Sequence, residues 1–518
     1  MFCKFFFTLS EIDIASISRD LPVTSNMFNK IFKVDKQQVE MEMEHQQNEH
    51  ESKKVYTIST NNEKRNEEAY SIGFQSKDPI IAIPSPEKVS KILEHESGEH
   101  GHVVKHPTNY METLMHLFKG NVGSGVFAMG DAFKNSGIAV GPILVPVLGL
   151  ICVHSQHLLL NASHYLQRNL NLEKNPGFST TVELCFATGP ARLQKLAPAM
   201  RIIVNLFLCL TQFGFCCVYF VFISTNVKQI MDYYGFVYSI HLHMAVILVP
   251  ILGSCLVRNL KYLAPLSTIA NVLMLTGIVI TLYYAGQKPF SEVELFSSPR
   301  QLPLFFGTAL FAFEGIGLVL PLQNEMKNSK NFDKPLGVLN VGMTFVTFLY
   351  LIVGILSYLK YGDGITGSVT LNLPEDEILA QTVKVMISLG ILFTFALQFY
   401  IPIDIMFPSV RKYFGPLSRP ILVELIFRTA FVLVTFTLAE IIPFLDLFIT
   451  LVGAFSSTAI ALIFPPILEL VNASASSEMT AWIVIKNAFI LIVGCLGCVT
   501  GSFESIKLIV KAFADGRS

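Results

Sequence analysis

Apolar runs of about 20 residues recur along the chain from Leu114 onward, and they limit the possible fold more than any other feature. An α-helix needs a run of this length to cross a hydrocarbon core roughly 30 Å thick. We therefore predict an all-α membrane protein with eleven transmembrane helices. The predicted spans, each placed to within several residues, are approximately 112–134, 138–162, 201–226, 241–257, 262–285, 302–322, 337–359, 379–407, 419–441, 444–471 and 481–504.

The charged residues divide the chain into two unequal parts. Overall the chain is 52% apolar and 15% charged, whereas charged residues make up about a quarter of ordinary soluble proteins. Residues 1–105 hold 30 of the 77 charges, and the stretch 35–70 has almost nothing to bury. We predict a disordered polar tail over 1–105 and a transmembrane domain over 106–518. The net charge of −1 gives no electrostatic reason to expect a nucleic-acid partner.

The loop charges predict the orientation of the chain. Short cytosolic loops are enriched in Lys and Arg. If the tail is cytosolic, the inner connections carry thirteen such residues and the outer ones five. The apolar run near Met1 is shorter than a signal peptide requires. We expect a cytosolic N-terminus and, with an odd number of spans, an extracellular or lumenal C-terminus. The inner cations are Arg168, Lys174, Arg192, Lys195, Arg201, Arg258, Lys261, Lys327, Lys330, Lys334, Arg411, Lys412 and Arg419.

Two of the predicted spans are interrupted by glycine and polar residues. The first contains Gly120-Asn121-Val122-Gly123-Ser124-Gly125, and the sixth contains Phe311-Ala312-Phe313-Glu314-Gly315-Ile316-Gly317. An unpaired backbone amide in mid-membrane is costly unless it lines a cavity or binds a ligand. Discontinuous helices at matching positions of two halves are typical of inverted-repeat transporters. We predict two five-helix repeats plus one extra helix, with helices 1 and 6 discontinuous.

The residues at the two breaks suit a zwitterionic ligand. Free N–H groups at the turn formed by Asn121, Val122, Gly123, Ser124 and Gly125 would attract a carboxylate. Free carbonyl groups near Phe311, Phe313, Glu314 and Gly315 would attract an ammonium group. The alternative is that these glycines serve only close helix packing. The occurrence of two such segments at symmetric positions favours a binding site.

Two titratable residues lie beside the breaks. His116 precedes the first break by one turn, and histidine changes its charge across the mildly acidic range. It is therefore a candidate for proton coupling, the alternative being a neutral imidazole that bonds a neighbouring helix. Glu314 is a second candidate, because a carboxylate within the membrane usually has a pairing, proton or ligand role. Lys384 and Lys486 are expected to extend to the membrane interface.

Two further spans carry aromatic residues among a few hydroxyl and amide groups. Gln212 and Tyr219 in the third span and Thr394 in the eighth are candidates for the wall of a substrate pocket, although an aromatic stripe often serves packing alone. The nine cysteines are expected to be packing residues. We find no nucleophile–base pair and no metal-ligand spacing, so an enzyme, a bound metal and a cofactor are not expected.

Several longer motifs resemble one known family. The run Glu112-Thr113-Leu114-Met115-His116-Leu117-Phe118-Lys119-Gly120-Asn121-Val122-Gly123-Ser124-Gly125 is similar to the first helix of the proton-coupled amino acid transporters. The core around Phe311 to Gly317, Leu371-Asn372-Leu373-Pro374 and Phe464-Pro465-Pro466 are similar too, and the likeness covers about 108–510. It differs at Gly130 and Asp131, where the family usually has a proline, and in lacking the extracellular cysteine pair of some members.

The resemblance implies a function as well as a fold. It implies symport of a small neutral amino acid with a proton, with His116 as the proton-handling residue, in the plasma membrane or in lysosomal and endosomal membranes. Two alternatives are kept open. One is an amino acid sensor that signals through the tail to cytosolic partners, and the other is a carrier driven by sodium or by exchange.

Overall fold

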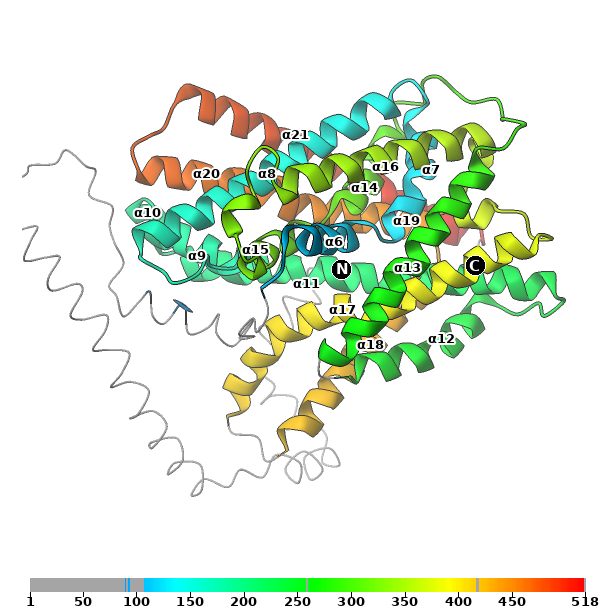
Figure 1. Ribbon diagram of the computed structural model, residues 1–518, viewed down its shortest axis with the longest axis horizontal. Helices are drawn as coiled ribbons and strands as arrows, with labels where there is room; N and C mark the ends of the chain where they lie inside the picture. Colours follow the sequence, from blue (N-terminus) through cyan, green and yellow to red (C-terminus); the bar gives the residue numbers. More distant parts are fainter. Residues whose placement is uncertain (1–88, 90–91, 94–106, 258–259, 416–418, 517–518) are drawn as a thin grey trace, which may run out of the picture. The chain divides into compact units, whose positions relative to one another are not determined.

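The computed structural model describes residues 89, 92–93, 107–257, 260–415 and 419–516. Within these ranges every named element is a helix (Figure 1), which confirms the predicted all-α class. The uninterrupted long helices are α8 (Gly141–Asn169), α11 (Ala197–Tyr233), α13 (Leu260–Ala285), α16 (Val338–Tyr361), α17 (Ile378–Phe414), α18 (Pro420–Ile441) and α21 (Ala481–Ala514).

Other spans consist of consecutive shorter pieces. α6 (Tyr110–Asn121) is followed by α7 (Ser124–Ser136), and α14 (Leu302–Phe313) by α15 (Ile316–Glu325), so both predicted breaks are present. The segment 445–475 begins as α19 (Leu445–Val452), passes through the π-helical turns η4 (Gly453–Ser457) and η5 (Ala459–Ile463), and ends as α20 (Phe464–Ala475). The short elements are α9 (Phe178–Thr188), α10 (Ala191–Gln194), α12 (Ile240–Cys255), η1 (Ser329–Asn331), η2 (Gly362–Gly364) and η3 (Val369–Asn372).

Length and composition mark nine of the described helical segments as able to cross a membrane. The apolar helix α12 is shorter, and the pair α6 and α7 is divided by its break. These two account for the difference from the eleven predicted spans, and the number eleven stays a prediction. The chain is a multi-pass membrane protein.

The described end of α17 and start of α18, within Met406–Phe427, belong to a different structural unit from Pro79–Ile405 and Arg428–Ser518. Within it the rings of Phe407 and Phe427 lie 5.8 Å apart. The helices α6, α7, α14 and α15, which contain the two breaks, belong to the larger unit.

Helix α14 is at the centre of the packing in the larger unit. It contacts α7, α19, η4 and α21. A Cβ atom added at Gly453 of η4 would lie 1.9 Å from the Gly307 carbonyl oxygen of α14, so the two backbones touch. Thr308 and Thr450 join α14 to α19 through their hydroxyl oxygens, 3.0 Å apart. Glycine at positions 307 and 453 lets the backbones of α14 and η4 approach closely, as is common between membrane helices. This packing fixes the helix that leads into the second break.

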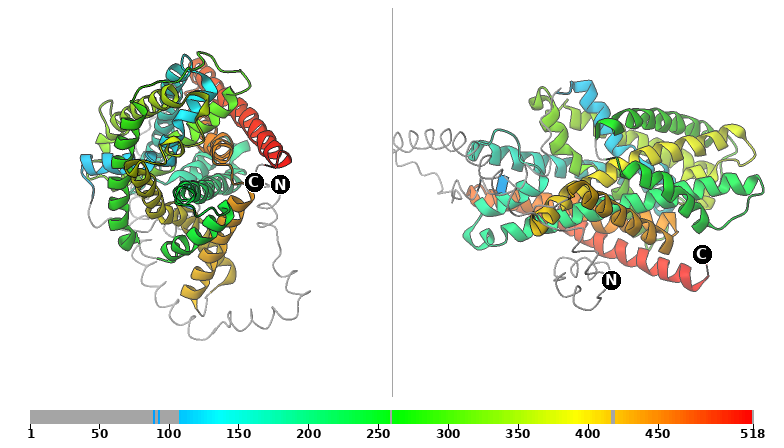
Figure 2. Two further views of the ribbon diagram at one scale, coloured as in Figure 1. Left: turned by 90° about the vertical axis from the view of Figure 1, so that its right-hand side faces the viewer. Right: turned by 90° about the horizontal axis from the view of Figure 1, so that it is seen from below.

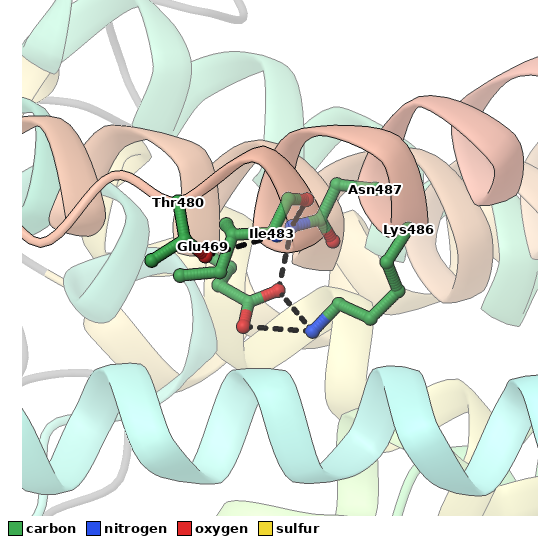
Figure 3. Close-up of polar contacts among 5 residues, drawn as sticks. All are labelled: Glu469, Thr480, Ile483, Lys486 and Asn487. Atoms are coloured by element: carbon green, nitrogen blue, oxygen red, sulfur yellow. Dashed lines mark hydrogen bonds and ion pairs between the residues drawn. The ribbon is translucent and has the colours of Figure 1, made fainter.

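Helices α20 and α21 are joined by a polar cluster of Glu469, Lys486 and Asn487 (Figure 3). Lys486 Nζ lies 2.8 Å from one carboxylate oxygen of Glu469 and 2.7 Å from the other. Asn487 Nδ2 donates to the same carboxylate at 2.6 Å. Lys486 therefore pairs with a neighbouring helix, and its extension to the membrane interface stays a prediction. Figure 2 shows α20 and α21 from two further sides.

Most of the predicted tail lies outside the described residues, so its disorder stays a prediction. Val89 and Ile92, which are described, are helical and buried. Arg201 of α11 donates from Nη1 to the Ile92 carbonyl oxygen at 3.2 Å and pairs with Glu183 of α9 at 2.9 Å. This part of the tail is therefore attached to the helical domain.

Candidate functional site

The first break separates α6 from α7 at Val122 and Gly123. Val122 still donates from its backbone N–H to the Phe118 carbonyl at 2.7 Å, and Gly123 then leaves the helical conformation. No side chain caps α7, which begins at Ser124. The first N–H groups of a helix have no acceptor within it and carry the positive end of its dipole. The buried residues Ser124 and Gly125 thus begin a helix that can attract an anionic group.

The second break separates α14 from α15 at Glu314 and Gly315. Glu314 has an extended backbone, and Gly315 precedes α15 without a side-chain cap. Phe311, Phe313 and Glu314 are all buried, with Glu314 only 6% exposed. The negative end of the α14 dipole and a carboxylate therefore meet at one place inside the bundle.

The two breaks lie directly against each other. A Cβ atom added at Gly125 would lie 2.7 Å from Ala312 Cα, and one added at Gly315 would lie 2.6 Å from Asn121 Oδ1. A side chain at Gly125 would collide with the Ala312 backbone, and one at Gly315 would force the Asn121 side chain to shift. The structure thus brings together the residues that the sequence predicted at the two breaks.

Tyr350 of α16 links the breaks, and sequence reasoning missed it. Its hydroxyl oxygen lies 2.7 Å from the Asn121 carbonyl oxygen and 2.7 Å from the Ala312 carbonyl oxygen. The side chain is fully buried, and its ring packs edge-on against Phe313 at 5.1 Å. Its span also carries Thr344, Thr347, Ser357 and Tyr358, so the sequence alone does not single out Tyr350. The Tyr350 hydroxyl is therefore within hydrogen-bond distance of one backbone carbonyl oxygen from each broken helix, and the two oxygens share its single proton.

Three buried side-chain acceptors near the breaks have no donor within the described residues. They are Asn121 Oδ1, Glu314 Oε1 and Gln212 Oε1. Asn121 uses its Nδ2 group to donate to the Leu117 carbonyl at 2.9 Å. Buried polar atoms in folded proteins nearly always have a partner, so these acceptors beside the breaks are available to a ligand or a proton that donates to them.

Helix α11 forms a wall beside the breaks. Gln212, Phe215 and Tyr219 lie on one face of this helix by their spacing. The Phe215 ring packs edge-on against Phe311 of α14 at 4.8 Å. The Tyr219 hydroxyl lies 3.6 Å from the position of a Cβ atom at Gly123, and Tyr219 also neighbours Glu314. Gln212 and Tyr219 are therefore both on the side of α11 that faces the broken helices.

Thr394 and His116 are less buried than the predicted residues at the two breaks, such as Asn121 and Glu314. Thr394 of α17 is half-buried, and its hydroxyl donates to the Gly390 carbonyl of its own helix at 2.8 Å. His116 is exposed on α6 and makes no hydrogen bond or ion pair with the described residues. Val122 is half-buried at the break itself.

The position where the sequence departs from the family pattern follows the first break. A Cβ atom at Gly130 would lie 2.9 Å from Ser357 Cβ and 2.2 Å from a terminal carbon of Ile365. Gly130 thus allows α16 and the following loop to approach α7. Asp131 is buried and accepts a hydrogen bond from Asn135 Nδ2 at 3.2 Å.

The fold and the two facing breaks define a membrane carrier built from discontinuous helices. The family of transmembrane amino acid transporter proteins matches residues 106–508, and the chain belongs to that family. Membership identifies an amino acid transporter rather than an enzyme.

Two relatives and two solved structures illustrate the similarity. The chain is 38% identical over 419 residues to the proton-coupled amino acid transporter-like protein pathetic of Drosophila melanogaster, covering 80% of this chain and 88% of the relative. It is 26% identical over 418 residues to the probable amino acid transporter skat-1 of Caenorhabditis elegans, covering 78% and 90%. MhsT in complex with L-phenylalanine matches at 14% identity and a TM-score of 0.46, covering 77% and 99%. Mhp1 in an inward-facing conformation matches at 14% identity and 0.48, covering 79% and 94%.

Proposed function

We propose that this transporter is a proton-coupled symporter of small neutral amino acids that works by alternating access. The observation that carries the proposal is the pairing of opposite chemistries at the breaks. The helix that starts at Ser124 without a side-chain cap can attract an anionic group. Asn121 Oδ1 and Glu314 Oε1, which have no donor among the described residues, can attract a cationic group. An amino acid zwitterion supplies both partners in one small molecule.

The proposed ligand lies between the two broken helices. Its carboxylate accepts from the first amides of α7 at Ser124 and Gly125, beside Val122 and Gly123. Its ammonium group donates to Asn121 and Glu314 near Gly315. Its side chain faces the apolar wall of Phe311, Phe313 and Tyr219, with Gln212 and Thr394 farther along it. The bulky aromatic wall favours a small neutral side chain.

The coupling ion in this proposal is a proton. Unwound carbonyls in broken helices commonly coordinate a cation such as sodium. Here the Tyr350 hydroxyl donates between the carbonyls of Asn121 and Ala312, so these groups already have a partner. Glu314 takes up the proton inside the bundle, where a neutral carboxyl group is favoured over a buried charge. His116, exposed on α6 one turn before the first break, is the proposed second residue of the proton path.

The expected location follows from the same proposal. The inner loops with their thirteen cations face the cytosol together with the N-terminus, and the C-terminus is extracellular or lumenal. The membrane is the plasma membrane or that of a lysosome or endosome, whose acidic outer or lumenal side supplies protons.

Uptake into proteoliposomes tests the proposal. Uptake of small neutral amino acids should increase when the outer pH is lowered to about 5.5, because histidine gains its proton in that range. It should persist when sodium is replaced. His116→Ala should abolish accumulation against a gradient while keeping counterflow exchange. Uptake that requires sodium and ignores pH would favour the sodium-driven alternative and refute proton coupling.

A sensor is the second candidate, and the attachment of Ile92 to Arg201 favours it. A tail that contacts α11 can transmit the state of the carrier to cytosolic partners. Deletion of residues 1–100 separates the two functions: a pure carrier keeps its uptake, whereas a sensor loses its signalling output.

A further inference from the structure

A polar cavity of about 450 Å³ lies at the C-terminal end of α8, away from the two breaks. An adjoining cavity of about 470 Å³ shares His164, Arg168 and Asp333 with it. The proposed transport function uses none of these residues. The cavity is lined by His164, Gln167, Arg168, Asn175, Gln323, Ser329, Lys330 and Asp333.

Hydrogen bonds hold one wall of this cavity in place. Gln323 lies in the last turn of α15. Its Oε1 atom is within hydrogen-bond distance of His164 Nε2, at 3.0 Å, and of Asn175 Nδ2, at 3.2 Å. Asn324 Nδ2 donates to the Asn175 carbonyl oxygen at 2.8 Å. His164 Nδ1 lies 3.7 Å from Asp333 Oδ2. The wall is therefore preformed, and it contains the end of the second broken helix.

Two cations line the cavity without an acidic partner. Arg168 on α8 and Lys330 on η1 are both exposed, and neither forms an ion pair with a described residue. Asp333 is the one acid in the lining and lies next to His164. Two cations from separate segments favour an anion that bridges them, and phosphate oxygens suit such a bridge.

The lining also contains two hydrogen-bond acceptors, Asn175 Oδ1 and the Asp333 carboxylate. Asn175 is only 8% exposed, yet its Oδ1 atom has no hydrogen-bond donor within the described residues. The Asp333 carboxylate is a second acceptor at the cavity. A bare phosphate has few protons to donate to these atoms, whereas a hydroxylated phosphate ester has several. The required ligand therefore combines phosphate oxygens with hydroxyl groups.

We infer that this cavity binds a phosphate-bearing polyhydroxyl group of the inositol phosphate or glycerol phosphate type. Its phosphate contacts Arg168 and Lys330, and its hydroxyl groups donate to Asn175 Oδ1 and Asp333. Basic pockets between helices at the cytoplasmic side of a membrane commonly bind lipid headgroups of this kind. The source is either such a lipid or a soluble ester. Because Gln323 forms part of the wall, the bound group also holds the end of α15.

Native mass spectrometry of the detergent-solubilised full chain tests this inference without measuring transport. The probes are phosphatidylinositol 4-phosphate, soluble inositol 1,4-bisphosphate and phosphatidic acid, which has a phosphate but no hydroxylated ring. The double variant Arg168→Gln with Lys330→Gln should bind phosphatidylinositol 4-phosphate about thirtyfold more weakly than the parent. The control double variant Arg192→Gln with Lys327→Gln removes the same charge from exposed sites outside the cavity and should bind like the parent.

The outcomes separate the source of the ligand from the existence of the site. Loss of inositol 1,4-bisphosphate binding in the Arg168 and Lys330 variant identifies a soluble ester, and loss of lipid binding alone identifies a headgroup; either result supports the site. Equal binding by the parent and this variant overturns the inference. So does an equal loss in the control variant, or phosphatidic acid binding as tight as that of the inositol lipid.

Discussion

Two of the carboxylates in the helical domain of this transporter, Glu469 and Glu314, have opposite surroundings. Glu469 on α20 accepts from Lys486 and Asn487 of α21 (Figure 3). Glu314 at the second break is more deeply buried, and its Oε1 atom has no donor among the described residues. A paired carboxylate joins two helices, whereas an unpaired one lowers stability and is retained for a ligand or a proton. We therefore expect the pairing state to separate a structural acid from a functional one.

Glu314→Gln should have the largest effect on transport. The amide keeps the size of the side chain, but it does not exchange a proton. We expect uptake to fall about 100-fold, since a charge-assisted hydrogen bond contributes up to about 3 kcal/mol. The melting temperature should stay within about 2 °C of the parent, because no partner loses a bond. The measurement is uptake normalised to surface protein, together with thermal unfolding in detergent.

Glu469→Gln is the matched control for that variant. It should keep most of its uptake per folded molecule, because Glu469 lies away from the breaks. Normal uptake by Glu314→Gln, or equal losses in the two variants, would contradict the distinction between them.

Glu469→Leu should affect stability rather than transport. It leaves Lys486 Nζ and Asn487 Nδ2 without their shared acceptor. Lys486 and Glu469 are 19% and 25% exposed in their side chains, so water reduces the cost to about 2 kcal/mol. Thermal unfolding checks this, and the double variant Glu469→Leu with Lys486→Leu should recover most of the loss. A double variant less stable than the single one would show that the ion pair is not the cause.

Tyr350→Phe tests the contact between the two breaks. The change removes one fully buried hydroxyl and leaves the carbonyls of Asn121 and Ala312 without its proton. We expect about a tenfold loss of uptake, because one buried hydrogen bond contributes roughly 1.4 kcal/mol. Uptake at saturating substrate should fall more than apparent affinity if the hydroxyl positions the breaks during the transport cycle.

Tyr358→Phe is a control on the same helix. Its hydroxyl is bonded to Asp363 Oδ1 at 3.1 Å and to the Glu294 backbone N–H at 3.2 Å, away from the breaks. It should lose stability similar to that lost by Tyr350→Phe but retain uptake. If both variants lose uptake equally, the effect of Tyr350 is only structural.

The sequence was sufficient for the helical class and for the two breaks, because both depend on local patterns. Runs of apolar residues predict spans, and the glycines around Asn121 and Glu314 predict interruptions in them. Gly125 and Gly315 were also identified, since their role follows from residue type.

Contacts between distant segments were not predictable in the same way. Tyr350 lies 229 residues from Asn121 and 38 from Ala312, and nothing in its own span distinguishes it from a packing residue. Lys486 was expected to extend to the membrane interface. Its partner Glu469 is on another helix, and the sequence does not show that the two residues meet. Lys384, which was expected there too, is 1% exposed and directs Nζ to the Leu373 carbonyl oxygen at 3.4 Å. Whether a polar group is paired depends on the tertiary structure.

Thr394→Val should have the smallest effect among the candidate site residues. The Thr394 hydroxyl already donates to the Gly390 carbonyl within α17, whereas Asn121, Gln212 and Glu314 each keep an acceptor that has no donor in the described part of the chain. Valine has nearly the same shape, so the wall of the pocket is preserved. We expect uptake and apparent affinity to change by less than about twofold, which corresponds to about 0.4 kcal/mol. A loss approaching that of Glu314→Gln would mean that the Thr394 hydroxyl leaves its own helix to bind substrate, and that an existing hydrogen bond does not exclude a residue from the site.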